Sequence, residues 1–382
     1  MIWLFLIVLI DGIGFGIILP LLPLFVLKFN LTPFHIGILA AVFSFAQFIT
    51  APILGMLSDK FGRKKIIVVC LFIISASYYL LSIASTFLIA VLARFLAGSF
   101  SGNISVVLAS ASDLSNSRNR TKYMGIIGAG YGIGFVLGPI IGGFLAGDTN
   151  SGANFHLVFY VAALFTLLAG VIAGVFSKET IKVKNNPINI FVNIKRTLTL
   201  IVNNKNLMFL IYLSILMWFA FASINVFLTT WAVLKFNLNP MQLGTIATIF
   251  ASIAAIMQIL SPKLISGGKA ILLGFQISAF SIFAIIFEPN INYLLILLAF
   301  LATGIGILFP NLNATISVQG STRSKGFILG LSQSSGMLGQ TLGPLIVGFL
   351  YSAYSPTYAW LTITASFILA SFITLFFMLN EK

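Results

Sequence analysis

The sequence predicts an all-α membrane protein with twelve transmembrane helices arranged as two six-helix pseudo-repeats. Three observations support this fold class. Hydrophobic residues make up 59% of the chain and charged residues 7%, with a mean hydropathy of +1.10, whereas soluble domains carry roughly 25% charged residues. Apolar runs long enough to cross a bilayer follow one another along the chain. A pattern in one of these runs returns 205 residues later.

A membrane-spanning helix needs roughly 20 apolar residues, and the apolar runs between turn and charge signals define twelve such helices. The first run is interpreted as a retained helix rather than a signal peptide, because Met1–Leu4 holds no basic residue and Asp11 interrupts the apolar core. The predicted spans lie near residues 2–27, 34–58, 66–84, 86–112, 122–147, 155–177, 206–234, 240–266, 270–287, 291–319, 326–352 and 356–379.

The basic residues predict the orientation of the spans. With a cytoplasmic N-terminus, the inner segments hold 18 of the 21 Lys and Arg residues, and the outer loops hold only Lys28 and Lys235. This asymmetry matches the positive-inside rule, so both termini are predicted to lie in the cytoplasm. The net charge of +14 is therefore explained by topology, and nucleic acid is not expected as a partner.

A polar segment divides the predicted spans into two groups of six. Residues 1–177 are expected to form an N-terminal six-helix bundle, residues 178–205 a cytoplasmic linker, and residues 206–382 a C-terminal six-helix bundle. The linker is too short for a catalytic domain, and the chain shows no nucleophile constellation or histidine cluster. An enzyme and a metal site are therefore not expected, since His35 and His156 stand in separate outer loops.

The helix predicted at 122–147 has a counterpart in the helix predicted at 326–352. Two related halves are typical of transporters that rock one helix bundle against the other around a central site. The matched segments are Gly138-Pro139 with Gly343-Pro344, and Gly143-Phe144-Leu145 with Gly348-Phe349-Leu350.

Four glycines in the 122–147 span recur at every fourth residue and therefore lie on one face of the helix. They are Gly130, Gly134, Gly138 and Gly142, with Pro139 inside the row. Such a face permits close approach of a neighbouring helix backbone. Ordinary small-residue packing would explain the row alone, whereas Pro139 and the repeat favour a hinge or an interface shared by the two halves.

Two ionisable residues, Asp11 and Arg94, lie inside apolar runs near the middle of the predicted bilayer. An ionised group at this depth costs at least ~2.5–3.5 kcal/mol, so it is seldom found without a partner or a function. The two residues are predicted to form a proton site and its counter-charge. The alternative is a fixed ion pair that holds the first and fourth spans together.

Four segments resemble a known family: GMLSDKFGRKK at 55–65, DGIGFGIILPLLP at 11–23, RFLAG at 94–98, and Gly138-Pro139. Together they resemble the major facilitator superfamily, in its drug/proton antiporter type similar to the tetracycline-resistance exporters. The resemblance implies that the arginine of the 55–65 loop pairs with an acid that closes the fourth span. It implies a cytoplasmic gate formed by Gly55, Asp59, Gly62, Arg63 and Asp113.

The sequence departs from the tetracycline exporters in the third and ninth spans. Further acids stand there in that family, where this chain has serines, so the resemblance does not carry tetracycline over as the substrate. Polar residues in the spans are candidates either for lining a substrate cavity or for interhelical hydrogen bonds. The candidates are Gln47, Ser77, Asn103, Asn225, Gln258, Ser278 and Asn311.

These observations predict a secondary active transporter that exports a small, partly apolar compound of the multidrug type by alternating access. Asp11 is expected to carry the proton, with Arg94 as its partner; the proton gradient is the energy source, and no cofactor is expected. The alternative is a uniporter or symporter of a metabolite with a structural Asp11–Arg94 pair. The protein is expected to work as a monomer in the lipid bilayer of a cell membrane, the bacterial inner membrane in the simplest case.

Overall fold

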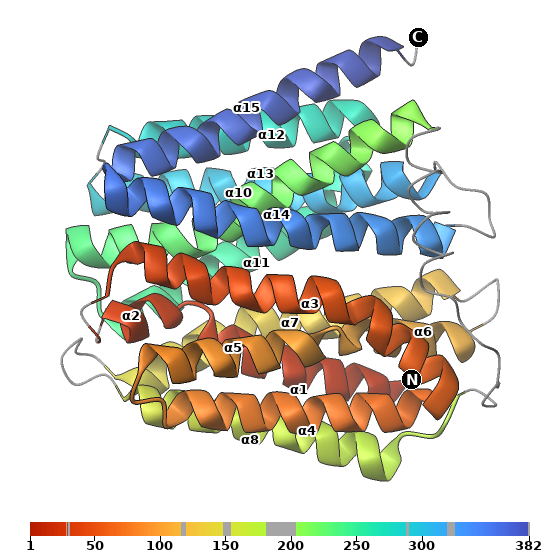
Figure 1. The fold of residues 1–382 in the computed structure, drawn as a ribbon. Helices are drawn as coiled ribbons and strands as arrows, with labels where there is room; N and C mark the ends of the chain where they lie inside the picture. The colour runs from red at the N-terminus through yellow and green to blue at the C-terminus, as the bar shows by residue number, and fades with distance from the viewer. Residues whose placement is uncertain are drawn as a thin grey trace. The chain divides into compact units, whose positions relative to one another are not determined.

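Every described element of the protein is a helix (Figure 1). The computed structural model describes residues 1–27, 29, 31–115, 120–147, 154–180, 204–287, 290–318 and 325–380. Its helices are α1 (Ile2–Ile18), α2 (Leu22–Leu27), α3 (Pro33–Phe61), α4 (Arg63–Ser82), α5 (Phe87–Ser101), α6 (Asn103–Asp113), α7 (Arg120–Ala146), α8 (Phe155–Phe176), α10 (Lys205–Phe236), α11 (Pro240–Leu264), α12 (Gly267–Ile285), α13 (Ile291–Val318), α14 (Lys325–Ala353) and α15 (Pro356–Asn380).

Ten segments in the described part of the chain are long and apolar enough to cross a membrane. Two further helices lie where spans are predicted: α1, which has 17 residues, and α14, which has 29. The chain is therefore an all-α, multi-pass membrane protein, and its helices agree with the twelve predicted spans.

Two predicted spans are broken in the structure. The span expected over 2–27 is interrupted between α1 and α2, because Pro20 has no N–H to donate and its ring obstructs the preceding turn. The span expected over 86–112 is interrupted at Gly102, between α5 and α6. A Cβ atom at Gly102 would lie 2.7 Å from the Cα of Ala51, so this break accompanies a close approach to α3.

The described chain divides into two compact units. Unit 1 comprises Met1–Ile188 and Ala232–Thr248, and unit 2 comprises Asn189–Trp231 and Ile249–Lys382. The end of α10 and the first turns of α11 thus group with unit 1. The predicted linker at 178–205 lies outside the described residues except at its two ends, and the division into two bundles at that linker stays a prediction.

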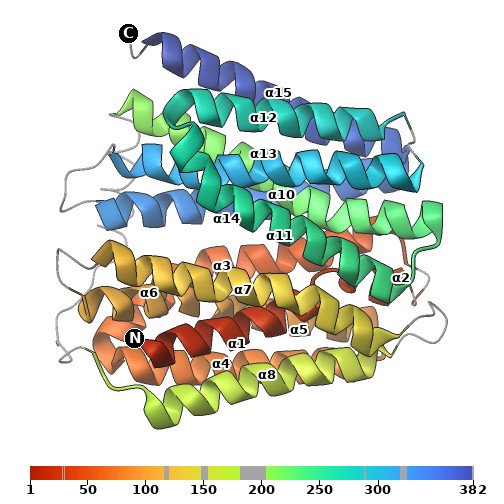
Figure 2. The ribbon, with the colours of Figure 1, turned by 180° about the vertical axis from the view of Figure 1, so that it is seen from behind.

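In unit 1, α1 packs against α7 and α8, α4 packs against α8 and α5, and α3 packs against α5 (Figure 2). Leu4, Ile67, Val106 and Ala169 represent a buried core contributed by α1, α4, α6 and α8. In unit 2, α12 packs against α13 and α15, and α14 contacts the same two helices. The residues of α1 that carry the candidate proton site are therefore held by packing within unit 1.

Candidate functional site

Asp11 lies in α1, which packs against α7 and α8. The residue is partly buried. Tyr78 of α4 and Tyr131 of α7 both lie within electrostatic range of its carboxyl group. A phenol hydroxyl can donate a hydrogen bond to a carboxylate or accept one from a protonated acid. Among the described residues no hydrogen bond joins Asp11 to either phenol, so the two tyrosines are polar neighbours of the acid rather than its bonded partners.

Arg94 is buried, with 3% of the residue exposed. Its guanidinium carbon lies 4.3 Å from the ring centroid of Phe43, in cation–π geometry. Gly98, one turn further along α5, leaves no space for a side chain because the backbone of Phe43 occupies it. The Nε atom of Arg94 has no hydrogen-bond partner within the described part of the chain. The guanidinium group of Arg94 is therefore positioned by the Phe43 ring, and its Nε–H can still donate a hydrogen bond.

No ion pair or hydrogen bond joins Asp11 to Arg94 among the described residues. Tyr78, which is 2% exposed, lies within electrostatic range of both charges. It stands next to Ser77, where the family resemblance implies an acid, and sequence reasoning missed it. The role of Asp11 and Arg94 as partners stays a prediction.

Aromatic rings connect the surroundings of the two charges in unit 1. The Phe15 ring, one turn after Asp11 in α1, lies 5.6 Å from the Phe43 ring and 6.1 Å from the Phe135 ring. Phe43 also contacts Arg94, so ring contacts link α1 and α3 to the arginine of α5. The Phe43 residue itself is buried, with 6% exposed, whereas Phe15 and Phe135 are partly buried.

Unit 2 has an aromatic cluster of its own on α10 and α13. The Trp218 ring lies 4.9 Å from the Phe309 ring and 5.6 Å from the Phe221 ring. Asn225, one turn after Phe221, is partly buried and donates from Nδ2 to the Phe221 carbonyl at 2.8 Å. No hydrogen bond to the amide oxygen of Asn225 is present within the described part of the chain, so this oxygen can accept one next to the aromatic cluster.

The other polar candidates fall into three groups. Gln47 of α3 donates to the Ser101 carbonyl of α5 at 3.3 Å, which makes it an interhelical contact. Asn103 and Gln258 form the second group, because no hydrogen bond of either side chain is present among the described residues. Asn103 is buried at the start of α6, and Gln258 of α11 is exposed. The remaining side chains are buried and donate to carbonyls of their own helices: Ser77 to Ile73, Ser278 to Gly274, and Asn311 to Ile307.

The loop between α3 and α4 is organised around the guanidinium group of Arg63. Its Nη2 atom lies 2.6 Å from Oδ1 of Asp59, and its Nε atom lies 3.2 Å from Oδ2 of Asp113. Its Nη1 atom also donates to the Ser58 hydroxyl at 2.6 Å. Arg63 therefore ties α3 to α6, and the contact with Asp113 that the family resemblance implies is present. Gly55 has open space around its Cα atom.

A second acid binds the backbone of the same loop, and the sequence analysis did not predict this contact. Glu179, which follows α8, accepts hydrogen bonds from the backbone N–H groups of Arg63 at 2.8 Å and Lys64 at 3.3 Å. It thereby caps the first turn of α4, where the helix dipole favours a negative charge. Gly62 has a φ of 101°, and the carboxylate of Glu179 fills the space a Cβ atom would need. Thr180 donates to Asp113 at 3.2 Å.

The four glycines of α7 face α1. At each of them, atoms of α1 occupy the space that a side chain would need. Backbone contact of this kind lets two membrane helices pack closely without side chains between them. The contacts pair Gly130 with Phe5, Gly134 with Leu9 and Gly12, Gly138 with Gly16, and Gly142 with Ile17.

A different face of α7 contacts the first turns of α11, which belong to the same unit. A Cβ atom at Gly143 would lie 2.7 Å from the Pro240 carbonyl oxygen, and the Pro139 carbonyl fills the space beside Gly244. The Thr248 hydroxyl donates to the Val136 carbonyl at 3.2 Å. Pro139 therefore lies where α7 is in contact with α11.

A family model described as the Major Facilitator Superfamily matches residues 4–330. The class B tetracycline resistance protein of Escherichia coli is 28% identical to this chain, with 98% of this chain and 95% of that protein covered. Multidrug resistance protein 2 of Bacillus subtilis is 26% identical, with 89% and 85% covered.

Among solved structures, the chain resembles a bacterial homologue of the human lysosomal transporter Spinster in an inward-facing and occupied conformation. The TM-score is 0.81 and the sequence identity 16%, with 99% of this chain and 96% of that chain covered. At this identity the likeness shows the fold alone.

Proposed function

Because the chain belongs to the Major Facilitator Superfamily, whose members are transporters, we propose that it is a proton-coupled exporter of small, partly apolar compounds. The tetracycline-resistance and multidrug-resistance names of its relatives support export as the direction of transport. The proposal places the protein in a bacterial cell membrane with both termini in the cytoplasm. Its partners are then the small-molecule cargo, protons and the surrounding lipid.

The observation that carries this proposal is the environment of Asp11. The acid is partly buried in a membrane helix, has two tyrosines within electrostatic range, and makes no ion pair among the described residues. An acid placed in this way can take up and release a proton without first breaking a salt bridge. We assign the role of proton carrier to Asp11 on this basis.

Arg94 is assigned a supporting role as a fixed positive charge. Its contact with the Phe43 ring positions it. Its Nε donor, which has no partner among the described residues, can bind the cargo or a hydroxyl group whose orientation changes when Asp11 gains or loses a proton. Tyr78, which lies within electrostatic range of both residues, is the candidate for that link. The partly buried Phe15 ring in unit 1 is proposed to contact the apolar part of the cargo.

The alternating motion is assigned to two structural elements. Arg63, Asp59 and Asp113, together with Glu179, are proposed to form the cytoplasmic gate at the end of unit 1. Their contacts hold α3, α4 and α6 together and are proposed to break when the cytoplasmic side opens. The glycine face of α7 is proposed as the surface that lets α1 and α7 move as one body. A monomer contains every element that this proposal uses.

A transport assay in proteoliposomes tests the proposal. Purified protein is reconstituted with an inward-acid pH gradient, and movement of tetracycline and of the lipophilic cation ethidium is followed by fluorescence. Gradient-driven movement of at least one compound is expected for the wild type and is expected to be lost in Asp11→Asn. Asp113→Asn serves as a control, because it changes an acid outside the membrane core and should slow transport without removing its dependence on the gradient.

One observation favours a second candidate function, a uniporter or symporter of a metabolite. Ser77 and Ser278 stand where the family resemblance implies acids, and both donate hydrogen bonds within their own helices, so Asp11 has no acidic substitute at these two positions. Cargo movement that is unaffected by the pH gradient, with Asp11→Asn retaining it, would support this alternative and refute the proton-coupled mechanism.

A further inference from the structure

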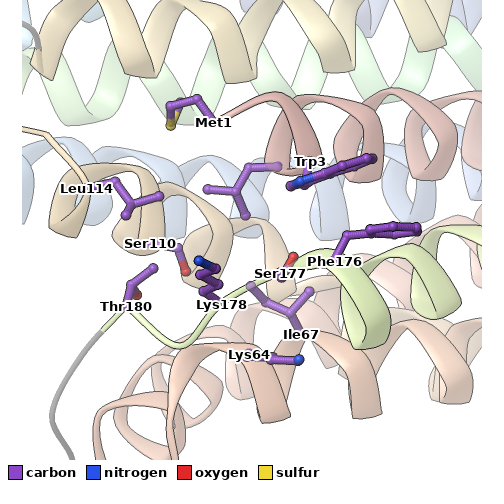
Figure 3. Close-up of a pocket in the computed structure, with 11 residues that line it drawn as sticks. Met1, Trp3, Lys64, Ile67, Ser110, Leu114, Phe176, Ser177, Lys178 and Thr180 are labelled. Carbon is purple, nitrogen blue, oxygen red and sulfur yellow. The ribbon is translucent and has the colours of Figure 1, made fainter.

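A cavity of about 190 Å³ lies at one end of unit 1, about 10 Å along α1 from Asp11 at 1.5 Å per residue (Figure 3). Its walls come from the starts of α1 and α4 and from the ends of α6 and α8. We propose that this cavity binds the phosphate head group of an anionic phospholipid from the cytoplasmic leaflet. The lining residues are Met1, Trp3, Leu4, Lys64, Ile67, Ser110, Leu114, Phe176, Ser177, Lys178 and Thr180.

The lysines of the cavity carry charge that no described acid neutralises. Lys64 and Lys178 make no ion pair among the described residues, although acids stand close by in sequence. Those acids are engaged elsewhere: Asp113 bonds to Arg63, and Glu179 accepts from two backbone N–H groups. The cavity therefore has an unbalanced positive charge, which favours an anionic ligand. Basic pockets between membrane helices on the cytoplasmic side are suited to phospholipid head groups.

One hydroxyl in the cavity is free to donate a further hydrogen bond, whereas Ser110 donates to the Val106 carbonyl and Thr180 to Asp113. The Ser177 Oγ atom is buried and has no hydrogen-bond partner within the described ranges. A buried hydroxyl without a partner loses stabilisation that a ligand oxygen can restore. Figure 3 shows Ser110 of α6, Ser177 and Lys178 near one another among the residues that line the cavity. A phosphate oxygen accepts hydrogen bonds from both ammonium and hydroxyl groups.

The apolar wall distinguishes a lipid from a soluble phosphate. Trp3 and Phe176 stack with ring centroids 4.4 Å apart, and 38% and 48% of these residues are exposed. Aromatic residues of this kind are enriched at the membrane–water interface. Leu4 and Ile67 line the cavity and also belong to the hydrophobic core of unit 1. The volume is below the roughly 300 Å³ of the smallest usual sites for drug-sized molecules, so it suits a head group rather than the exported cargo.

Trp3 provides a probe inside the cavity. In the full-length protein with Trp218, Trp231 and Trp360 replaced by Phe, brominated phosphatidylglycerol is expected to quench Trp3 fluorescence at lower mole fraction than brominated phosphatidylcholine. The change Lys64→Gln or Lys178→Gln is expected to weaken the phosphatidylglycerol preference about fivefold.

Lys65→Gln is the matched control, since Lys65 is the exposed neighbour that does not line the cavity. Native mass spectrometry of the otherwise unmodified protein and of the three lysine variants counts bound phosphatidylglycerol, which keeps the test valid if the tryptophan variant does not fold. Equal quenching by the two lipids, or an equal loss in Lys65→Gln, would overturn the proposal. Displacement of the lipid by millimolar inorganic phosphate would assign the site to a free anion instead.

Discussion

The contact between α1 and α7 allows a prediction in which two nearly identical substitutions have opposite effects. Gly134 and Gly132 lie two residues apart in α7. A Cβ atom at Gly134 would lie 2.5 Å from the Leu9 carbonyl oxygen and 2.8 Å from the Gly12 carbonyl carbon, whereas a Cβ atom at Gly132 meets no atom within 4 Å. We expect Gly134→Ala to destabilise the protein and Gly132→Ala to be neutral or stabilising.

The size of the expected loss of stability in Gly134→Ala follows from these distances. Comfortable contacts between carbon atoms are about 3.5–4.0 Å, so Gly134→Ala requires α1 and α7 to separate by about 1 Å along a crossing that consists of backbone atoms. Overpacking of this kind costs about 1–3 kcal/mol. Both substitutions gain the same helix propensity, about 1 kcal/mol for Gly to Ala. That gain cancels in the comparison, so the two variants should differ by about 1–3 kcal/mol.

The assay is thermal unfolding of the detergent-purified variants, followed by size-exclusion chromatography with fluorescence detection after heating. The expected order of apparent melting temperatures is Gly132→Ala at or above wild type and Gly134→Ala below it. An equal decrease in both variants would show that α7 does not tolerate alanine in general. Equal melting temperatures for Gly134→Ala and Gly132→Ala, both at or above wild type, would show that α1 and α7 do not approach as closely as described.

Two further predictions concern Glu179 and the serines of the third and ninth spans. Glu179→Ala should speed hydrogen exchange at the Arg63 and Lys64 amides roughly two- to fivefold, because it removes a helix cap; unchanged exchange would contradict the cap. Ser77→Ala and Ser278→Ala should change stability by less than about 1 kcal/mol and leave cargo transport near the wild-type rate, because each hydroxyl bonds within its own helix. Loss of transport in either serine variant would place that hydroxyl in the cargo path.

The fold could be predicted because membrane helices leave a strong signal in the sequence. The apolar runs predicted the all-helical membrane fold, and the resemblance to the major facilitator superfamily is confirmed by the family match over residues 4–330. The breaks between α1 and α2 and at Gly102 were missed. Pro20 was visible, but a proline can also be accommodated in a membrane helix, and the Gly102 break depends on contact with α3.

The candidate site could be predicted less completely, because its parts come from different helices. Asp11 and Arg94 stand out as charges in apolar runs, so the sequence alone identifies them. Phe43 and Tyr78 have no such signal, since aromatic residues are frequent throughout the chain and only the packing of α3, α4 and α5 brings these two near the charges. Glu179 was assigned to the linker because nothing in its local sequence indicates a cap on α4.

The packing of α7 suggests how proton transfer and helix movement are coupled under the proposed function. Asp11 stands next to Gly12, whose side-chain space is occupied by the Tyr131 carbonyl and the Gly134 backbone. On another face, α7 contacts α11 through Pro139 and Gly143. Because the contacts at Gly134, Gly138, Gly142 and Gly143 are made of backbone atoms, side-chain rotation cannot absorb a shift of α7 at these four positions. A change at the α7–α11 contact must therefore displace the backbone beside Asp11 or open the α1–α7 crossing.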